Sequence, residues 1–278
     1  MSDDRSPPTD DRPHADDGRS RGSAGDDRSR KRTTAESFGR AAEAYFESSV
    51  HREGDDLDRI GSWCADANRA LDVATGAGHT AGAIAAAGVP TVVAADISPE
   101  MIDTAATAYD GVLGVVADAE RLPFADDSFD AVACRIAAHH FPDPEAFVAE
   151  VARVLSPGGV FAFEDNVVPE DERLATFLNG IERLRDPTHV RHRSVSRWRG
   201  WFADAGLSVR ESSVANLPIE YEPWVERTSV PPDRRRELEA RFAGAPDAAV
   251  DLFEIETDAD GVRSFSIPKA LIEATAEE

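Results

Sequence analysis

Short apolar runs alternate with amphipathic or alanine-rich stretches through the middle of the chain. The runs predict five β-strands, the first at the short run with Leu71 and Val73 and the others at residues 91–95, 112–117, 129–134 and 160–164. Between them, residues 79–88 and 144–155 have the composition and spacing of helices. The second helix is followed by the breaker Ser156-Pro157-Gly158-Gly159. Strands that alternate with helices in this way predict an α/β fold with a doubly wound, mostly parallel sheet and helices on both faces.

The pattern changes after residue 165. Helices are predicted at 170–185 and 198–205, a sixth strand at 207–217, and a closing strand at 262–272 behind a turn at 258–261. Residues 221–250 predict a helical insertion before this last strand. Because insertions near strand ends shape ligand pockets, we expect residues 165–250 to determine substrate specificity.

The N-terminal part divides into two segments. Residues 1–34 are Asp, Arg, Ser, Pro and Gly with almost nothing to bury, which predicts a disordered tail. Residues 35–63 show apolar spacing typical of two amphipathic helices, and the folded domain is expected to span residues 35–278.

The first strand and helix are joined by a glycine turn with a carboxylate on each side. Asp72 ends the first strand, Gly76 and Gly78 form the turn, and Asp96 ends the second strand. This order is typical of the first unit of a nucleotide-binding sheet, in which the turn lets a ligand approach the backbone. The spacing also fits the relaxed dinucleotide fingerprint, with Ala81 in third place.

The charge of Asp72 bears on which nucleotide is bound. A carboxylate here would repel the pyrophosphate of a dinucleotide but attract the sulfonium and ammonium groups of S-adenosylmethionine. The structural alternative is that Asp72 fixes the turn through hydrogen bonds. At the following strand ends, Asp96 is placed to accept hydrogen bonds from ribose hydroxyls. Asp118, beside the small Ala119, is placed to bind the adenine amino group.

Five motifs in order resemble those of class I S-adenosylmethionine-dependent methyltransferases. They are the runs at 71–80 and 95–102, Asp118-Ala-Glu-Arg-Leu-Pro-Phe124, Asp126-Asp-Ser-Phe-Asp130 and Arg153-Val-Leu-Ser-Pro-Gly-Gly159. The chain more narrowly resembles the type 11 group, related to ubiquinone and menaquinone biosynthesis methyltransferases, over roughly residues 37–215. The resemblance implies a seven-stranded sheet whose last strand is antiparallel, and S-adenosylmethionine as the cofactor.

The resemblance also implies roles for individual residues. Asp72 would bind the methionine ammonium, Gly76 and Gly78 the methionine backbone, and Asp96 the ribose. Ile97 and Met101 would contact the adenine face, and Asp118 and Ala119 its edge. Ala74 replaces a family glycine, so we expect a slightly altered turn with binding retained.

Three further residues are candidates for the cofactor site. Arg135, after the fourth strand, either contacts the cofactor carboxylate or braces the loop. In the resembling family the N-terminal segment covers the cofactor, and here Tyr45, with His51, is the candidate for that lid; packing alone is the alternative for Tyr45.

Methyl transfer by in-line displacement needs alignment of the acceptor, and a base only where the acceptor must lose a proton. Candidate bases are His139, His140, His189 and His192, although the His139-His140 pair is also common as a structural connection in this family. His79, at the first helix turn, is interpreted as structural. The methylated atom can be carbon, oxygen or nitrogen; a quinone-type ring carbon is suggested by the resemblance.

The net charge of −23 changes the expected environment and excludes some partners. Residues 1–32 hold equal numbers of acidic and basic residues, so the whole excess of acid lies in the folded part, and Lys31 and Lys269 are the two lysines. Such a surface resembles proteins of salt-accumulating halophiles, where salt screens self-repulsion; a surface built for a basic partner is the alternative. It disfavours nucleic acid as a substrate.

The remaining expectations concern the compartment and other function classes. Two cysteines without ligand or disulfide spacing, and the absence of a signal-like apolar segment, favour the cytoplasm, with no membrane span and no metal site. Two other functions remain alternatives: a non-catalytic S-adenosylmethionine-binding regulatory partner, and a nicotinamide-dependent oxidoreductase. A small-molecule acceptor is the expected substrate, and the oligomeric state is left open.

Overall fold

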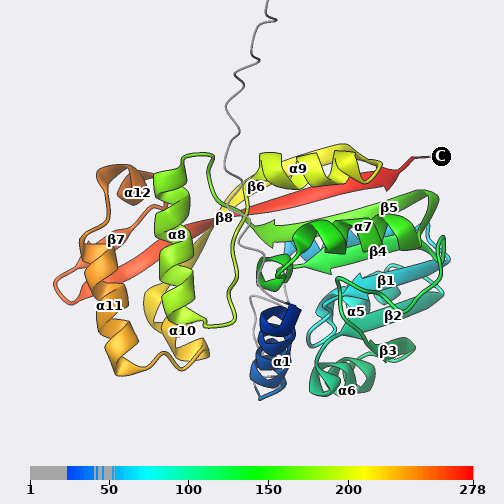
Figure 1. Ribbon diagram of the computed structural model, residues 1–278, viewed down its shortest axis with the longest axis horizontal. Helices are drawn as coiled ribbons and strands as arrows, with labels where there is room; N and C mark the ends of the chain where they lie inside the picture. Colours follow the sequence, from blue (N-terminus) through cyan, green and yellow to red (C-terminus); the bar gives the residue numbers. More distant parts are fainter. Residues whose placement is uncertain (1–23, 41, 43–45, 47–51, 53, 278) are drawn as a thin grey trace, which may run out of the picture.

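The computed structural model describes residues 24–40, 42, 46, 52 and 54–277. Their centre is one sheet in the order β3-β2-β1-β4-β5-β8-β6, with β7 paired to β8 (Figure 1). The strands are β1 Arg69–Val73, β2 Thr91–Asp96, β3 Val112–Val116, β4 Phe129–Arg135, β5 Leu155–Asn166, β6 Leu207–Glu220, β7 Glu256–Asp258 and β8 Gly261–Ala276. The predicted α/β architecture is confirmed, with eight strands because the short β7 adds one to the seven expected.

Strands β1 to β5 run parallel to one another, and β8 runs antiparallel to each strand that it pairs with. β1 pairs in parallel with β2 and β4, β2 with β3, and β4 with β5. β8 runs antiparallel between β5 and β6, as the resemblance implied for the last strand. The carboxyl ends of the parallel strands therefore meet along one edge, where Asp72, Asp96 and Arg135 lie.

Side chains that alternate along these strands belong to two hydrophobic cores, one on each face of the sheet. Leu71 and Val132 point into a core shared with α7 Pro144–Val154 and α9 Val195–Asp204. On the opposite face the small residues Ala70 and Ala131 pack under α4 Asp55–Cys64 and α5 His79–Ala86. The helix α6 Pro99–Ala108 contacts β2 and β3. Helices therefore cover both faces, which leaves the polar strand ends for a ligand.

A helical cap covers the far part of β8. It consists of α8 Glu172–Arg185, α10 Tyr221–Arg227, α11 Pro232–Ala243 and α12 Asp247–Leu252, and it gathers at the left of Figure 1. Its core is separate and aromatic, built around Tyr221, Trp224, Phe242, Phe253 and Phe265. The predicted insertion is confirmed as helical, and β7 and β8 form a hairpin at the predicted turn.

Two boundaries differ from the sequence prediction. Helix α1 spans Ala24–Arg40, so the prediction of disorder is wrong for residues 24–34, which α6 and the ion pairs of Lys31 hold in place. The breaker at Ser156–Gly159 lies inside β5 and produces a register shift opposite β4 instead of a separate loop. The candidate lid residues Tyr45 and His51 lie outside the described residues. None of the described helices is both long and apolar enough to cross a lipid bilayer.

Candidate active site

A cavity of about 1050 Å³, including its open mouth, lies over the carboxyl ends of β1 to β4. Its floor is the β1–α5 turn, and its walls come from the segments that follow β2, β3 and β4. Helix α1 closes one side with Lys31, Thr34 and Phe38. Eight of the predicted cofactor residues line it: Ala74, Gly76, Asp96, Ile97, Met101, Asp118, Ala119 and Arg135.

The β1–α5 turn has three residues with positive φ. Gly76 has a φ of 53°, and nothing lies within 4 Å of the position where a side chain would begin, so its backbone is bare toward the cavity. Gly78 has a φ of 91° and ends the turn as the N-cap of α5. Ala74 has a φ of 55°, a conformation that disfavours a Cβ. This explains why glycine suits position 74, whereas the altered turn expected there stays a prediction.

Gly78 serves packing, and the prediction that it contacts the cofactor is not supported. It does not line the cavity, and a Cβ there would come within 2.7 Å of the Ala105 Cβ. The glycine lets α5 approach α6 closely. It therefore positions the turn through packing, without itself facing the cavity.

Asp72 lies beneath the turn and is also absent from the cavity lining. Its Oδ2 accepts hydrogen bonds from Thr75 Oγ1 at 2.5 Å and from the Ala81 N–H at 3.0 Å. Burial raises the pKa of Asp72 to about 7. Asp72 therefore fixes the turn, as the structural alternative proposed, and its contact with the cofactor ammonium stays a prediction. The charge argument against a dinucleotide also weakens, because the carboxyl is partly protonated near neutral pH.

Asp96 joins the end of β2 to the glycine turn. Its Oδ2 accepts a hydrogen bond from the Gly76 N–H at 2.9 Å, and its Oδ1 accepts one from the Ser98 N–H at 2.9 Å. Burial raises the pKa of Asp96 despite these bonds. The carboxylate is thus held at the cavity edge in a fixed orientation, with lone pairs left for hydroxyl donors.

Asp118 is tied to helix α1. Lys31 Nζ lies 2.6 Å from Asp118 Oδ2 and 2.5 Å from Glu120 Oε2, while Asp118 Oδ1 accepts a hydrogen bond from the Glu120 N–H. Burial opposes the charge on Lys31, but its two carboxylate partners raise its pKa overall. One of the two lysines of the chain therefore fastens α1 across the cavity.

Arg135 and the second lysine form a buried ion network behind the cavity. Arg135 Nη2 lies 2.5 Å from Asp56 Oδ2, and Arg135 Nε lies 3.2 Å from Glu164 Oε2. Lys269 Nζ pairs with the same two carboxylates. Burial raises the pKa of Glu164 to about 7, whereas for Asp56 the cations outweigh burial and lower the pKa. Arg135 both lines the cavity and braces α4 against β5, so the two sequence interpretations are compatible.

Comparison with known proteins gives the family. A methyltransferase domain model matches residues 71–163. The uncharacterized methyltransferase YcgJ of Bacillus subtilis is 38% identical over 85% of this chain and 96% of its own length. The chain belongs to the class I methyltransferases. The crystal structure of YcgJ covers 80% of this chain and 98% of its own at 37% identity, with a TM-score of 0.77.

Two further relatives extend this comparison. The crystal structure of a putative methyltransferase from Bacillus halodurans covers 81% of this chain and 100% of its own, at 33% identity and a TM-score of 0.77. A demethylmenaquinone methyltransferase of Clavibacter sepedonicus is 44% identical, over 33% of this chain and 38% of its own length. The quinone-related likeness thus covers a third of the methyltransferase, while the YcgJ likeness covers most of it.

The family implies S-adenosylmethionine as the cofactor, and the cavity fits it. The bare backbone at Gly76 leaves room for a chain to pass close to the turn. The fixed Asp96 carboxylate offers acceptors to a diol, and the apolar Met101 and Ala119 offer surfaces to an adenine ring.

Four histidines gather where η1 (Ala138–His140) meets the loop after α8. His140 lines the cavity, and its Nδ1 is 3.1 Å from Thr188 Oγ1, which in turn donates to Asp186 Oδ1 at 2.6 Å. Because Thr188 uses its proton on Asp186, His140 donates from Nδ1 and carries its lone pair on Nε2. Burial and the neighbouring His139 lower the pKa of His140 to about 3.

His139 lies behind His140 and differs from it in charge. Its Nδ1 is 2.6 Å from Asp165 Oδ1, and its ring centroid is 4.2 Å from that of His140. Burial alone would lower the pKa of His139, but the Asp165 carboxylate raises it above its ordinary value. Since His139 does not line the cavity, the two adjacent histidines have separate roles.

His189 and His192 do not line the cavity either. Together with Glu182 they form a compact buried group that sequence reasoning missed. His79 lines the cavity and its Nδ1 is 2.6 Å from the Tyr109 hydroxyl.

The cavity walls also differ from expectation. Among the described residues that line it, none comes from residues 165–250, the predicted specificity region. The walls come instead from α1 and from the segment after β4, with Phe38, Ile136, His140 and Phe141. Ile136 has a φ of 51°, which is rare for a β-branched residue and marks a strained position at the wall. The amphipathic spacing around Phe38 was the available sequence signal for the α1 wall.

Proposed function

We propose that this methyltransferase transfers the methyl group of S-adenosylmethionine to a small-molecule acceptor by in-line displacement. The observation that carries the proposal is the bond between Asp96 and the Gly76 N–H, at 2.9 Å, on the floor of the cavity. It places a hydroxyl-binding carboxylate next to a backbone that a ligand can approach closely.

The proposed contacts follow the order of the strand ends. Asp96 accepts the ribose hydroxyls, Ile97 and Met101 pack on the adenine face, and Asp118 with Ala119 meets its edge. Gly76 and the strained Ala74 face the methionine backbone, and Arg135 lies toward its carboxylate. Tyr45 is retained as the proposed lid contact.

The cofactor supplies a methyl group already activated on a positively charged sulfur. The chain then has to align the acceptor and exclude water. His140 carries the Nε2 lone pair at the cavity wall, and with a pKa of about 3 it is a weak base. We therefore propose that His140 aligns the acceptor as a neutral hydrogen-bond acceptor.

This role makes a prediction about pH. The His140→Ala variant should lower kcat by about 10- to 100-fold, comparable to the loss of one positioned hydrogen bond to a reacting group, with little change in cofactor affinity. In the wild-type enzyme kcat should show no ionisation of His140 between pH 5 and 8. A wild-type inflection near pH 6.5 that disappears in His140→Ala would assign it the role of base instead.

The proposed acceptor is a flat, largely apolar molecule. Phe38, Phe141 and Leu122 line the cavity together with His140, and the Phe38 and His140 rings meet edge to face at 4.9 Å. Aromatic walls favour a planar ring. Because a demethylmenaquinone methyltransferase is among the partial relatives, quinone-type compounds methylated at a ring carbon are the first acceptors to test.

The decisive experiment combines calorimetric titration with a transfer assay, in molar potassium chloride because of the acidic surface. We expect S-adenosylmethionine and S-adenosylhomocysteine to bind and NADH not to bind. Transfer of a labelled methyl group to a panel of small aromatic acceptors should then follow. Binding without transfer to any acceptor supports the non-catalytic regulatory alternative, and binding of NADH alone supports an oxidoreductase.

A further inference from the structure

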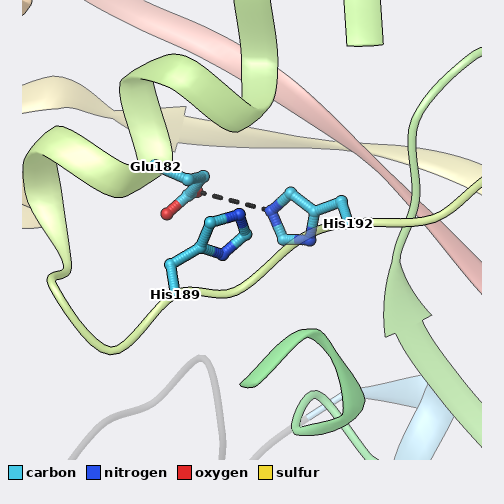
Figure 2. Close-up of side chains that lie close together, drawn as sticks. All are labelled: Glu182, His189 and His192. Atoms are coloured by element: carbon cyan, nitrogen blue, oxygen red, sulfur yellow. Dashed lines mark ion pairs between the residues drawn. The ribbon is translucent and has the colours of Figure 1, made fainter. Parts of the chain in front are cut away.

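Glu182, His189 and His192 face one another in the interior, away from the cavity lining (Figure 2). Glu182 lies in the last turn of α8, and the two histidines lie on the loop that follows it. One ligand atom from each side chain lies within 4.8 Å of the others, and all three residues are buried. Figure 2 shows the carboxylate and both imidazoles converging on the same small volume.

The converging atoms lack hydrogen-bond partners among the described residues. These atoms are Glu182 Oε1, His189 Nδ1 and both ring nitrogens of His192. Only 3% of Glu182 and 1% of His192 is exposed, so solvent does not reach them freely. Buried polar groups in folded proteins are almost always satisfied, and an unsatisfied one costs roughly 1–3 kcal/mol. Ligand atoms of all three side chains, which lie within 4.8 Å of one another, are therefore open to a shared partner.

Surrounding contacts orient the free atoms toward one point. His189 Nε2 lies 2.9 Å from Asn179 Oδ1, an acceptor, so His189 is protonated at Nε2 and its Nδ1 carries the lone pair. The same Asn179 oxygen accepts the His192 backbone N–H at 2.7 Å. Arg185 Nη1 holds Glu182 Oε2 at 3.1 Å, which leaves Oε1 for the cluster. Hydrogen bonds that fix the tautomer and orientation of ligands are typical of metal sites.

The distances do not fit direct hydrogen bonding. Glu182 Oε1 and His192 Nε2 are 4.0 Å apart, too far for a hydrogen bond. Two ligands of one ion, each bound at about 2.0–2.2 Å, lie up to about 4.2 Å apart. A small contraction of the cluster would therefore suffice to enclose an ion.

We propose that Glu182, His189 and His192 bind one divalent transition-metal ion of the Zn²⁺ type. Two imidazoles and one carboxylate are a donor set for zinc and related ions, whereas Ca²⁺ and Mg²⁺ prefer sites made of oxygen. A histidine coordinates a metal through the lone pair of its neutral imidazole, and the contact of His189 Nε2 with Asn179 Oδ1 leaves such a lone pair on His189 Nδ1. His139, whose ring centroid is 4.9 Å from that of His192, stands next to the site.

The ion would brace the cavity wall from behind. The backbone N–H groups of Val190 and Arg191, between the two histidine ligands, donate to the His139 carbonyl at 3.0 Å. His139 is followed directly by His140 at the cavity. An ion that fixes this loop to α8 therefore also fixes the segment that presents His140. This site is additional to the proposed methyl transfer and does not depend on it.

The test is titration of the chelator-treated full chain with Co²⁺ in molar potassium chloride. We expect one tight equivalent per chain, with the intense visible bands of cobalt bound by nitrogen at low coordination number. Glu182→Gln and His192→Ala should weaken this binding by more than about 100-fold. His79→Gln, a histidine substitution outside the cluster, should bind like the wild type.

Two controls keep the result interpretable. Circular dichroism checks that each variant is folded, and Glu182→Gln keeps the size of the side chain if His192→Ala does not fold. Surface carboxylates also bind Co²⁺, but they give the faint bands of octahedral oxygen coordination. A folded wild type with only those faint bands, or variants that bind like the wild type, would overturn the proposal. Zn²⁺ should raise the wild-type Tm and leave that of Glu182→Gln unchanged.

Discussion

The two ends of the sheet are built from differently oriented strands and serve different purposes. At the β1–β4 end the strands are parallel and are packed with small residues, and their carboxyl ends carry buried acids around a cavity. At the β6–β8 end the strands are antiparallel and support a cap whose core is made of large aromatic rings. Parallel strands collect their ends at one edge, whereas an antiparallel pair divides its ends between two. The first end can therefore hold a ligand, and the second holds helices.

The two ends also differ in whether their buried polar side-chain atoms have hydrogen-bond partners. Asp72 and Asp96 have several hydrogen bonds each from the turn and strand ends. In the cap, by contrast, Trp224 Nε1 and Tyr221 Oη lack hydrogen-bond partners within the described part of the chain. Stability of the cap thus rests on apolar packing, and geometry of the cavity rests on hydrogen bonds.

Trp224→Ala should have the largest effect. Trp224 is buried against Phe265, at a centroid distance of 4.9 Å, and under the Arg185 guanidinium, so its removal should lower the free energy of unfolding by about 3–5 kcal/mol. Denaturant unfolding measures this, with the exposed Leu252→Ala as control. Cofactor affinity of the folded variant should change less than twofold; a large loss would show that the cap shapes the cofactor site.

Asp96→Ala should weaken cofactor binding and leave the packing of the cap unchanged. Loss of hydrogen bonds to a charged acceptor should weaken S-adenosylmethionine binding by about 1.5–3 kcal/mol. Calorimetry measures the change, and Asp103→Ala, an exposed acid on α6, is the matched control. Unchanged affinity in Asp96→Ala would remove the ribose role.

Asp72→Asn tests whether the buried acid is structural. The pKa of Asp72 is raised to about 7 from an ordinary value of 3.8, so the folded state keeps a proton that the unfolded state loses. Its contribution to stability is therefore present below pH 4 and is lost as pH rises to about 7. Relative to wild type, the variant should gain about 2 kcal/mol between pH 4.5 and 7.5, roughly half of what the full shift implies. Urea unfolding at both pH values measures this, with exposed Asp66→Asn as control; equal pH dependence in variant and wild type would refute the raised pKa.

Ala74→Gly should have the smallest effect. Relief of a positive φ at a residue with a Cβ should stabilise the fold by about 0.5–1 kcal/mol, with cofactor affinity unchanged. Ala77→Gly, in the same turn but without a positive φ, should instead destabilise by a similar amount. Thermal unfolding of both variants checks the sign, and destabilisation by Ala74→Gly would mean that the turn is not strained.

Much of the cavity floor was predictable because its parts are close in sequence. Asp72, Gly76 and Asp96 span 25 residues, and β1 and β2 pair in register, so local spacing already places the acids at one edge. The roles were less predictable. Whether Asp72 or Gly78 touches a ligand depends on side-chain and helix packing, and both proved to lie behind the cavity surface.

The sequence by itself determined the succession of strands and helices along the chain, the acidic strand ends, the helical nature of the cap and the resemblance to methyltransferases. These depend on periodicity and short spacing, which the chain encodes locally. The tertiary structure decided which segments wall the cavity and brought Glu182, His189 and His192 into contact behind His139 and His140. It also placed Lys31 across the cavity onto Asp118, 87 residues away. These long-range contacts depend on how helices and loops pack over the sheet, and no local sequence pattern specifies that packing.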